Sequence, residues 1–476
     1  MIDSQPLSVA LRERIAGAGQ SGILRFWDEL SGLEQSEFAR QLSQVDWDFI
    51  AGSRNEKSCN AIRAEQITPP TCLIHRPHSI ADLEDWSLAR CDGQARLHAG
   101  QIAVVLVAGG LATRLGVAQP KGMFPIGPVN GHSLFQLLAE QVVTLGRRYQ
   151  VSIPYLIMTS DATHDQTVEW FSRHHWFGLP PEDVTFFRQG WSPAFDAVSG
   201  SLLLSSKSSL AVNPDGHGGV LDAMSKSGLF AELQRRQIET LFYHQVDNPL
   251  VHVCDPAFLG FHAQHGADVS TKVVCKRSPD ERVGVVVEVD GRVDVIEYSD
   301  LPEQLAFARE VDGQLRFRAG NTAIHLFQRT FLERIATQGA GLPWHRVVRQ
   351  NSFVDENGQT VHPQSANAVK YERFVFDILP LAETAIVVEA DREREFAPLK
   401  NAEGECSPVE VQNSMTAIAA KRLRGAGVVV PDAIPVEISS LAVLPDETFS
   451  LRDDCPRFVE RPMMFGTSQI EPSPLN

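Results

Sequence analysis

Hydrophobic and polar positions follow a helical rhythm in the first part of the chain. Apolar residues between Leu7 and Phe49 recur at mostly helical spacings among charged side chains, which predicts amphipathic helices, and the glycine-containing stretch Gly17–Gly22 divides them. A polar, proline-containing segment follows, and then a short helix predicted at Ile80–Arg90. We therefore predict that residues 1–98 form a helical N-terminal region and a connecting arm.

The pattern changes at Ile102, where a continuous apolar run begins. Ile102–Ala108 is rich in β-branched residues and ends at Gly109 and Gly110, which predicts a strand buried on both faces that leads into a tight loop. The elements predicted next alternate between helix and strand, at Ser133–Tyr149 (helix), Pro154–Thr159 (strand), Asp165–His174 (helix) and Thr240–Gln245 (strand). Such alternation indicates an α/β fold with a doubly wound, mostly parallel, Rossmann-like sheet.

Two local signals refine this prediction. Ser133 is placed to cap the helix that follows it, with Gln136 as its capping-box partner. Farther along, the runs Gly284–Val289 and Arg292–Tyr298 flank an Asp-Gly pair, which predicts a β-hairpin. We place the main domain at residues 99–385 and a small, β-rich C-terminal domain at residues 386–476.

Composition excludes several classes of function. The net charge is −16, from 43 basic and 59 acidic side chains, so the chain is a poor candidate for coating nucleic acid or an anionic membrane. The seven cysteines are scattered, with no Cys-x-x-Cys pair, which argues against a disulfide framework or a zinc cluster. No signal-peptide pattern or membrane-length apolar run is present. We expect a cytoplasmic protein that is a monomer or weak homo-oligomer.

The loop after the first buried strand is the main candidate for chemistry. In Leu106–Pro125, glycines let the backbone approach a nucleotide closely, and Arg114 and Lys121 could neutralise charge on a triphosphate. The loop is neither a G-x-G-x-x-G fingerprint nor a Walker A loop, so by itself it is only a moderate signal. Taken alone, Arg114 could equally form a surface ion pair.

At this loop the sequence resembles a known family. Val107-Ala-Gly-Gly-Leu-Ala-Thr-Arg-Leu-Gly116 followed by Gln119-Pro-Lys-Gly-Met123 resembles the nucleotide-binding signature of UDP-sugar pyrophosphorylases, and the branch it resembles most is that of the UDP-N-acetylhexosamine (UDP-N-acetylglucosamine) pyrophosphorylases. Further motifs resemble the family in the same order: Phe187-Arg-Gln-Gly190, Pro214-Asp-Gly-His-Gly-Gly219, Gln245-Val-Asp-Asn-Pro249, Val295-Ile-Glu-Tyr-Ser299, Gly320-Asn321, Lys370-Tyr-Glu-Arg-Phe-Val-Phe-Asp377 and Phe396-Ala-Pro-Leu-Lys-Asn401.

The resemblance implies a GT-A type nucleotidyltransferase domain at residues 99–385 and a division of roles among the matching residues. It implies UTP binding by Ala108, Gly109, Gly110, Lys121, Gln189, Gly216, Asp247 and Lys370, and sugar binding by His217, Gly284, Glu297, Tyr298, Asn321 and Lys400. It implies catalysis by Arg114, Lys121 and Lys400, with magnesium (Mg²⁺) at Asp247. The sugar phosphate would attack the α-phosphorus directly, so positioning and charge neutralisation would carry the reaction.

Two positions depart from the family pattern. Ala112 stands where the family loop usually has glycine, which would strain the backbone if that position needed a positive φ. His217 stands where the acetylhexosamine branch usually has asparagine, and its Gly-His-Gly run resembles the UDP-glucose and broad-specificity branches. His217 leaves a UDP-glucose or broad-specificity enzyme open as an alternative. A non-catalytic UDP-sugar binder is a separate alternative, against which the retained Arg114, Lys121, Asp247 and Lys400 argue. A dehydrogenase fails because the loop lacks its fingerprint.

Overall fold

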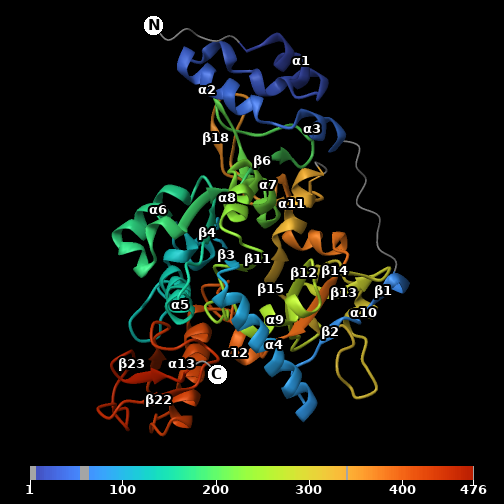
Figure 1. Cartoon of the computed structure of the whole chain (residues 1–476). Coiled ribbons are helices and arrows are strands. Elements are labelled where there is room, and N and C mark those ends of the chain that lie inside the picture. Colours follow the sequence, from blue (N-terminus) through green and yellow to red (C-terminus); the bar gives the residue numbers. More distant parts are fainter. Residues whose placement is uncertain (1–6, 54–63, 339–340, 475–476) are drawn as a thin grey trace. The chain divides into compact units, whose positions relative to one another are not determined.

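The computed structural model describes residues 7–53, 64–338 and 341–474. The chain divides into two compact units, each built from separate stretches of sequence (Figure 1). Unit 1 comprises Met1–Arg63, Gln189–Gly219 and Leu342–Val375, and unit 2 comprises Ala64–Arg188, Val220–Gly341 and Phe376–Asn476. The three domains expected from the sequence stay a prediction.

A large sheet forms the centre of unit 2. Its main path runs β2 (Leu73–Ile74), β20 (Ala385–Glu389), β12 (Val269–Cys275), β15 (Ala319–Gln328), β11 (Thr240–Gln245), β3 (Ile102–Val107), β4 (Tyr155–Thr159) and β5 (Val184–Arg188). Neighbouring strands are parallel except at β15, which is antiparallel to both β12 and β11. The predicted doubly wound, mostly parallel α/β sheet is confirmed. The carboxyl ends of β3, β11, β12 and β20 therefore share one edge of the sheet.

A hairpin branches from this sheet as the sequence predicted. It consists of β13 (Val285–Val289) and β14 (Arg292–Ile296), and β13 also pairs with β1 (Ile67–Thr68) and, at Gly320, with β15. Asp290 and Gly291 join its strands with φ values of 51° and 76°. Positive φ at both turn residues is what the tight hairpin turn requires, so the Asp-Gly prediction is confirmed.

Helices alternate with the strands of unit 2 along the chain. They are α4 (Ile80–His98), α5 (Leu134–Tyr149), α6 (His164–Arg173), α7 (Val220–Lys226), α8 (Leu229–Arg235), α9 (Pro256–Gln264), α10 (Glu303–Ala306), α11 (Arg329–Thr337) and α12 (Arg392–Glu395). Ser133 caps α5 by accepting a hydrogen bond from the Gln136 amide, as predicted. The expected capping box is wrong, because the Gln136 side chain donates to Glu140 instead of returning to the cap.

Helices α4 and α9 cross at two glycines. A Cβ on Gly93 would stand 1.8 Å from the carbonyl oxygen of Pro256, and one on Gly260 would stand 1.6 Å from that of Ala89. The prediction that this helix ends at Arg90 is wrong, since α4 continues to His98. The buried stripe Ala89, Gly93 and Leu97 explains the extension, because tertiary packing carries the helix through a residue of poor helix propensity.

The C-terminal part of unit 2 combines strands with one longer helix. The helix is α13 (Pro408–Gly425), and the strands are β21 (Val436–Ile438), β22 (Phe449–Leu451), β23 (Met463–Phe465) and β24 (Ile470–Pro472). Leu423, Val436 and Phe465 belong to its separate hydrophobic cluster.

Within the described residues, no helix has both the length and the apolar character needed to cross a membrane. The cysteines described there are all free thiols, and Cys59 lies outside the described residues.

Unit 1 joins the N-terminal helices to small strands. The helices are α1 (Val9–Gly17), α2 (Gly32–Ser43) and α3 (Trp47–Ser53), so the predicted break after Gly17 is confirmed. The strands are β6 (Trp191–Pro193), β7 (Phe195–Asp196), β8 (Leu204–Ser206), β9 (Ser209–Leu210), β10 (Val212–Pro214), β16 (His345–Arg349), β17 (Phe353–Val354), β18 (Thr360–Val361) and β19 (Ala368–Glu372). Trp47, Phe38 and Leu42 are buried in a core shared with Phe195 and Val369.

Candidate active site

The glycine-rich loop after β3 folds back on itself. The Lys121 amide donates to the Gly110 carbonyl at 3.0 Å, and the Ala112 amide donates to the Gln119 carbonyl at 2.8 Å. The Ser160 hydroxyl holds the Gly109 carbonyl at 2.8 Å. A Cβ on Gly110 would meet no atom within 4 Å. Hydrogen bonds within the loop and from Ser160 therefore fix its backbone, and the space beside Gly110 stays open, as close approach of a ligand requires.

Ala112 causes no backbone strain in this loop. Its φ is −85° and its ψ is 29°, whereas the neighbouring Gly116 has a φ of 81°. The Ala112 side chain is also buried. Because this position does not need the left-handed conformation, the departure from the family glycine is harmless.

Lys121 meets two other segments at the carboxyl edge of the sheet. Its Nζ donates to the Leu399 carbonyl at 3.0 Å and lies 3.7 Å from Asp247 Oδ2, and both side chains are 18% exposed. Asp247 follows β11, and its carbonyl accepts from the Leu399 amide at 2.7 Å. The structure thus brings together Lys121, Asp247 and the segment that carries Lys400, which are far apart in the sequence.

Lys400 and Arg114, the other two cations predicted to bind phosphate, differ in their contacts. The Lys400 amide donates to the Cys406 carbonyl at 2.9 Å. Burial raises the pKa of the Cys406 thiol, and the Lys400 ammonium partly opposes that shift. Arg114 lies in a short 3₁₀ turn of the glycine-rich loop, is exposed, and forms no ion pair with any residue that the structure describes. Among these residues, the surface ion pair considered for Arg114 is therefore not formed.

A second cluster of predicted residues lies where the hairpin meets β15. The Asn321 amide donates to the Gly284 carbonyl at 2.8 Å, and Glu297 Oε1 would lie 3.4 Å from a Cβ on Gly284. The Asn321 side chain accepts from the Ala323 amide at 3.0 Å, at a bulge where Ala323 has a φ of 57°. Tyr298 is exposed beside them. Four of the residues predicted to bind sugar therefore share one surface of unit 2.

Lys276 extends this cluster and was not singled out from the sequence. It follows the last residue of β12, is 8% exposed, and its Cγ would lie 3.5 Å from a Cβ on Gly320. Burial lowers its pKa, against the opposing effect of the Glu281 and Asp280 carboxylates. Its place at the carboxyl end of a parallel strand is the signal that could have identified it.

Unit 1 holds the predicted residues Gln189, Gly216, His217 and Lys370. Asp215, buried at 1% exposure, forms an ion pair with Arg373. Gly216, with a φ of 85°, packs so closely on the Arg373 backbone that a Cβ would lie 2.4 Å from its carbonyl oxygen. This buried pair was missed because Pro-Asp-Gly has the composition of an ordinary turn. It anchors the loop that carries Gly216 and His217.

The His217 imidazole is fixed by the segment that follows β19, the strand that carries Lys370. Its Nδ1 accepts from the Val375 amide at 3.1 Å, and its ring stacks on Phe374 with centroids 5.3 Å apart. Because Nδ1 of the neutral ring accepts a hydrogen bond, the ring proton lies on Nε2, and Nε2 is a hydrogen-bond donor. Burial lowers the pKa of Lys370, while the Glu372 carboxylate opposes that shift.

Two other features of unit 2 compete as candidate sites. His252, Asp255 and Asp446 lie close enough to share a metal ion, but Lys272 and Arg90 already bind the two carboxylates. A cation there would face two resident positive charges.

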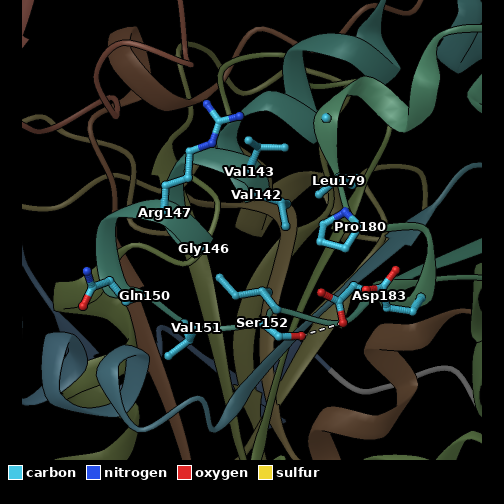
Figure 2. A pocket seen from close by; sticks show the side chains of 13 residues that line it. Val142, Val143, Gly146, Arg147, Gln150, Val151, Ser152, Leu179, Pro180 and Asp183 are labelled. Carbon is cyan, nitrogen blue, oxygen red and sulfur yellow. Dashed lines mark hydrogen bonds between the residues drawn. The ribbon is translucent and has the colours of Figure 1, made fainter.

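A pocket of about 470 Å³ lies beside Ser152, whose hydroxyl donates to Asp183 (Figure 2). Its lining residues precede β4 and β5, so it opens at the amino ends of the strands, away from the candidate site.

Comparison with known proteins agrees with this geometry. The family model for UTP–glucose-1-phosphate uridylyltransferase matches residues 49–412. The UDP-N-acetylglucosamine pyrophosphorylase of Saccharomyces cerevisiae is 35% identical over 448 residues, covering 89% of this chain and 92% of the relative. The human UDP-N-acetylhexosamine pyrophosphorylase-like protein 1 is 35% identical over 412 residues, covering 83% of this chain and 80% of the relative.

A solved structure supports the same fold. The uridine diphosphate N-acetylglucosamine pyrophosphorylase of Trypanosoma brucei superposes with a TM-score of 0.76 and 24% sequence identity, covering 93% of each chain. At that identity the likeness concerns the fold. The family match and the extent of the yeast and human alignments go further, and by them this chain belongs to the UTP–glucose-1-phosphate uridylyltransferase family.

Proposed function

We propose that this protein joins UTP and N-acetylglucosamine-1-phosphate to give UDP-N-acetylglucosamine and pyrophosphate. The observation that carries the proposal is the meeting of Lys121, Asp247 and the Lys400 segment beside the open space at Gly110. This arrangement puts two cations and one carboxylate at the carboxyl edge of a parallel sheet, where α/β proteins bind nucleotides. The names of the yeast and human relatives supply the sugar nucleotide.

The reaction needs positioning more than acid–base chemistry. A phosphate oxygen of the sugar phosphate forms a bond to the α-phosphorus of UTP, and the bond from that phosphorus to the pyrophosphate oxygen breaks in line. The attacking oxygen is already anionic, so no strong base is required. Lys121 and Arg114 neutralise the charge that develops on pyrophosphate, and Lys400 holds the sugar phosphate. The uracil is read by Gln189 and the backbone at Gly216, and Lys370 assists at the phosphates.

The residues present fit a magnesium ion at Asp247. Magnesium usually takes one or two protein carboxylates and completes its shell with water and substrate phosphate oxygens. Asp247 offers one partly exposed carboxylate, 3.7 Å from Lys121, at the edge where the phosphates of UTP would lie. When bound, the ion would neutralise phosphate charge. The side chain of Asp247 would hold it, and Lys121 would keep that carboxylate oriented.

The cluster around Gly284 is the place where we propose that the sugar binds. Glu297 and Asn321 would bind its hydroxyl groups, Tyr298 would flank it, and the Gly284 backbone would face its 2-substituent. His217 favours a second candidate, a UDP-glucose or broad-specificity enzyme, because a fixed imidazole is bulkier than the asparagine usual in the acetylhexosamine branch. The acidic net charge argues against nucleic-acid or membrane partners. We propose a cytoplasmic protein that is a monomer or weak homo-oligomer.

Pyrophosphate release tests the proposal directly. The protein is incubated with UTP and Mg²⁺ and, separately, with N-acetylglucosamine-1-phosphate, N-acetylgalactosamine-1-phosphate or glucose-1-phosphate. Preference for the first sugar supports the proposal, and preference for glucose-1-phosphate transfers it to the second candidate. Protein that binds UTP but releases no pyrophosphate with any sugar is a non-catalytic binder. Asp247→Ala and Lys400→Ala should each leave folded protein with little turnover, whereas Lys421→Ala, at an exposed lysine of α13, should behave as wild type.

A further inference from the structure

Lys272 is a buried lysine that no role in the proposed reaction uses. It lies on β12 and is 2% exposed. Its Nζ donates to Asp255 Oδ2 at 2.6 Å and to Glu395 Oε2 at 2.5 Å. Burial opposes its charge, but these two carboxylates raise the pKa of Lys272 above its ordinary value. A lysine buried this completely stays charged because carboxylates lie within hydrogen-bond distance of its ammonium group.

The two carboxylates belong to different parts of the fold. Asp255 caps the first turn of α9 by accepting from the Ala257 amide at 3.0 Å. Glu395 is the last residue of α12 and immediately precedes the segment Phe396–Lys400. The contact of Lys272 with Glu395 therefore lies directly before the segment that carries Lys400, whereas its contact with Asp255 lies at the start of a helix.

Hydrogen bonds tie this segment to the turn after β11. The Glu395 carbonyl accepts from Asn248 Nδ2 at 2.7 Å, and Asn248 Oδ1 accepts from the Ala397 amide at 3.1 Å. The Leu399 amide then donates to the Asp247 carbonyl at 2.7 Å. All three bonds depend on where the segment begins, which is directly after Glu395.

We propose that the Lys272–Glu395 ion pair is a positioning device that sets the Phe396–Lys400 segment against Asp247 and thereby places Lys400 for the transfer reaction. Lys272 and Glu395 are positioning residues that act through Lys400 and do not themselves touch substrate. The inference rests on the proposed function, since it assigns Lys400 to the sugar phosphate. It also predicts an effect on the geometry of the segment that does not depend on activity.

Glu395→Gln and Asp255→Asn form a matched pair of variants. Each removes one negative charge from Lys272 and leaves the other carboxylate to neutralise it, and asparagine still caps a helix. Lys272→Met would instead leave the buried Asp255 and the partly buried Glu395 carboxylates without their cation, so loss of folding would obscure the result. Only Glu395→Gln loosens the attachment of the Lys400 segment, so the two variants separate positioning from general stabilisation.

Steady-state kinetics and amide exchange together test the proposal. For Glu395→Gln, we expect kcat to fall about tenfold or more and the KM for sugar-1-phosphate to rise, with the KM for UTP little changed, because small misplacement of a binding group is costly. The Ala397 and Leu399 amides should exchange faster. Asp255→Asn should keep near-normal kinetics and exchange at these amides, even if it melts lower.

Each result bears on the inference. Equal kinetic losses in the two variants would overturn it, as would a loss in Glu395→Gln without faster exchange at Ala397 and Leu399. Wild-type protein that releases no pyrophosphate would refute the proposed function instead. In that case the exchange difference between the variants still decides whether the ion pair positions the segment.

Discussion

Gly122 offers a way to displace Lys121 without changing any charge. It lies in the short 3₁₀ turn Lys121–Met123, and a Cβ there would stand 2.3 Å from Cζ of Phe135 and 2.4 Å from both Cε atoms. Carbon atoms in contact stay about 3.5–4.0 Å apart, so Gly122→Ala requires a shift of roughly 1 Å or more. Phe135 is fully buried on α5 and packs edge to face on Phe171, with centroids 5.1 Å apart. The loop is therefore the part that moves.

The displacement should affect stability and turnover by different amounts. Overpacking of this kind costs about 1–3 kcal/mol of unfolding free energy. Lys121 Nζ, now 3.0 Å from the Leu399 carbonyl, would move with the loop. Misplacement by about 1 Å of a group that stabilises the transition state can cost around 100-fold in rate. We expect Gly122→Ala to melt moderately lower but to lose most of its turnover.

Pyrophosphate release and thermal melting of Gly122→Ala check this expectation, and a second substitution provides the control. Phe135→Leu removes the ring atoms that an alanine at position 122 would strike. Alone it should cost stability by leaving a cavity, with turnover largely retained. Together, the two substitutions should recover turnover relative to Gly122→Ala. Wild-type turnover in Gly122→Ala, or a double variant no more active than Gly122→Ala, would refute the reasoning.

Three further predictions follow from single contacts. Gly93→Ala should destabilise the protein by about 3 kcal/mol or more in thermal or denaturant unfolding, because the new methyl group meets the Pro256 backbone. The control is Gly425→Ala in α13, which should be neutral or slightly stabilising because a Cβ there meets nothing within 4 Å. Burial lowers the pKa of His244 to about 4, so between about pH 6.5 and pH 4 the unfolded chain binds more protons than the folded one and the free energy of unfolding falls as the pH drops. Unfolding measured across that range should show a shallower fall for His244→Gln, and an unchanged slope would contradict the assignment. Glu297→Gln should raise the KM for sugar-1-phosphate and leave the KM for UTP nearly unchanged, while equal increases in both would argue against a sugar contact.

Local patterns in the sequence accounted for the elements of the central fold. The apolar run at Ile102–Ala108, the cap at Ser133 and the Asp-Gly turn at residues 290–291 were all found where they were predicted. Each signal is local, since burial on both faces, a capping hydroxyl and a turn with positive φ depend on residues that are near neighbours in the chain. The motif order also placed the chain in its family, which the family match confirmed.

Tertiary packing decided which of these residues meet. Nothing in the spacing of Lys121, Asp247 and Leu399 predicts that an ammonium, a carboxylate and two backbone groups form one cluster, because that depends on which strands are neighbours in the sheet. Likewise, Gly93 weakens a helix by local propensity and was no reason to extend α4, yet the close crossing with α9 requires it. Short-range pattern reports which side chains are buried, whereas the partners of a buried charge such as Lys272 come from distant segments and are selected only when the whole sheet is assembled.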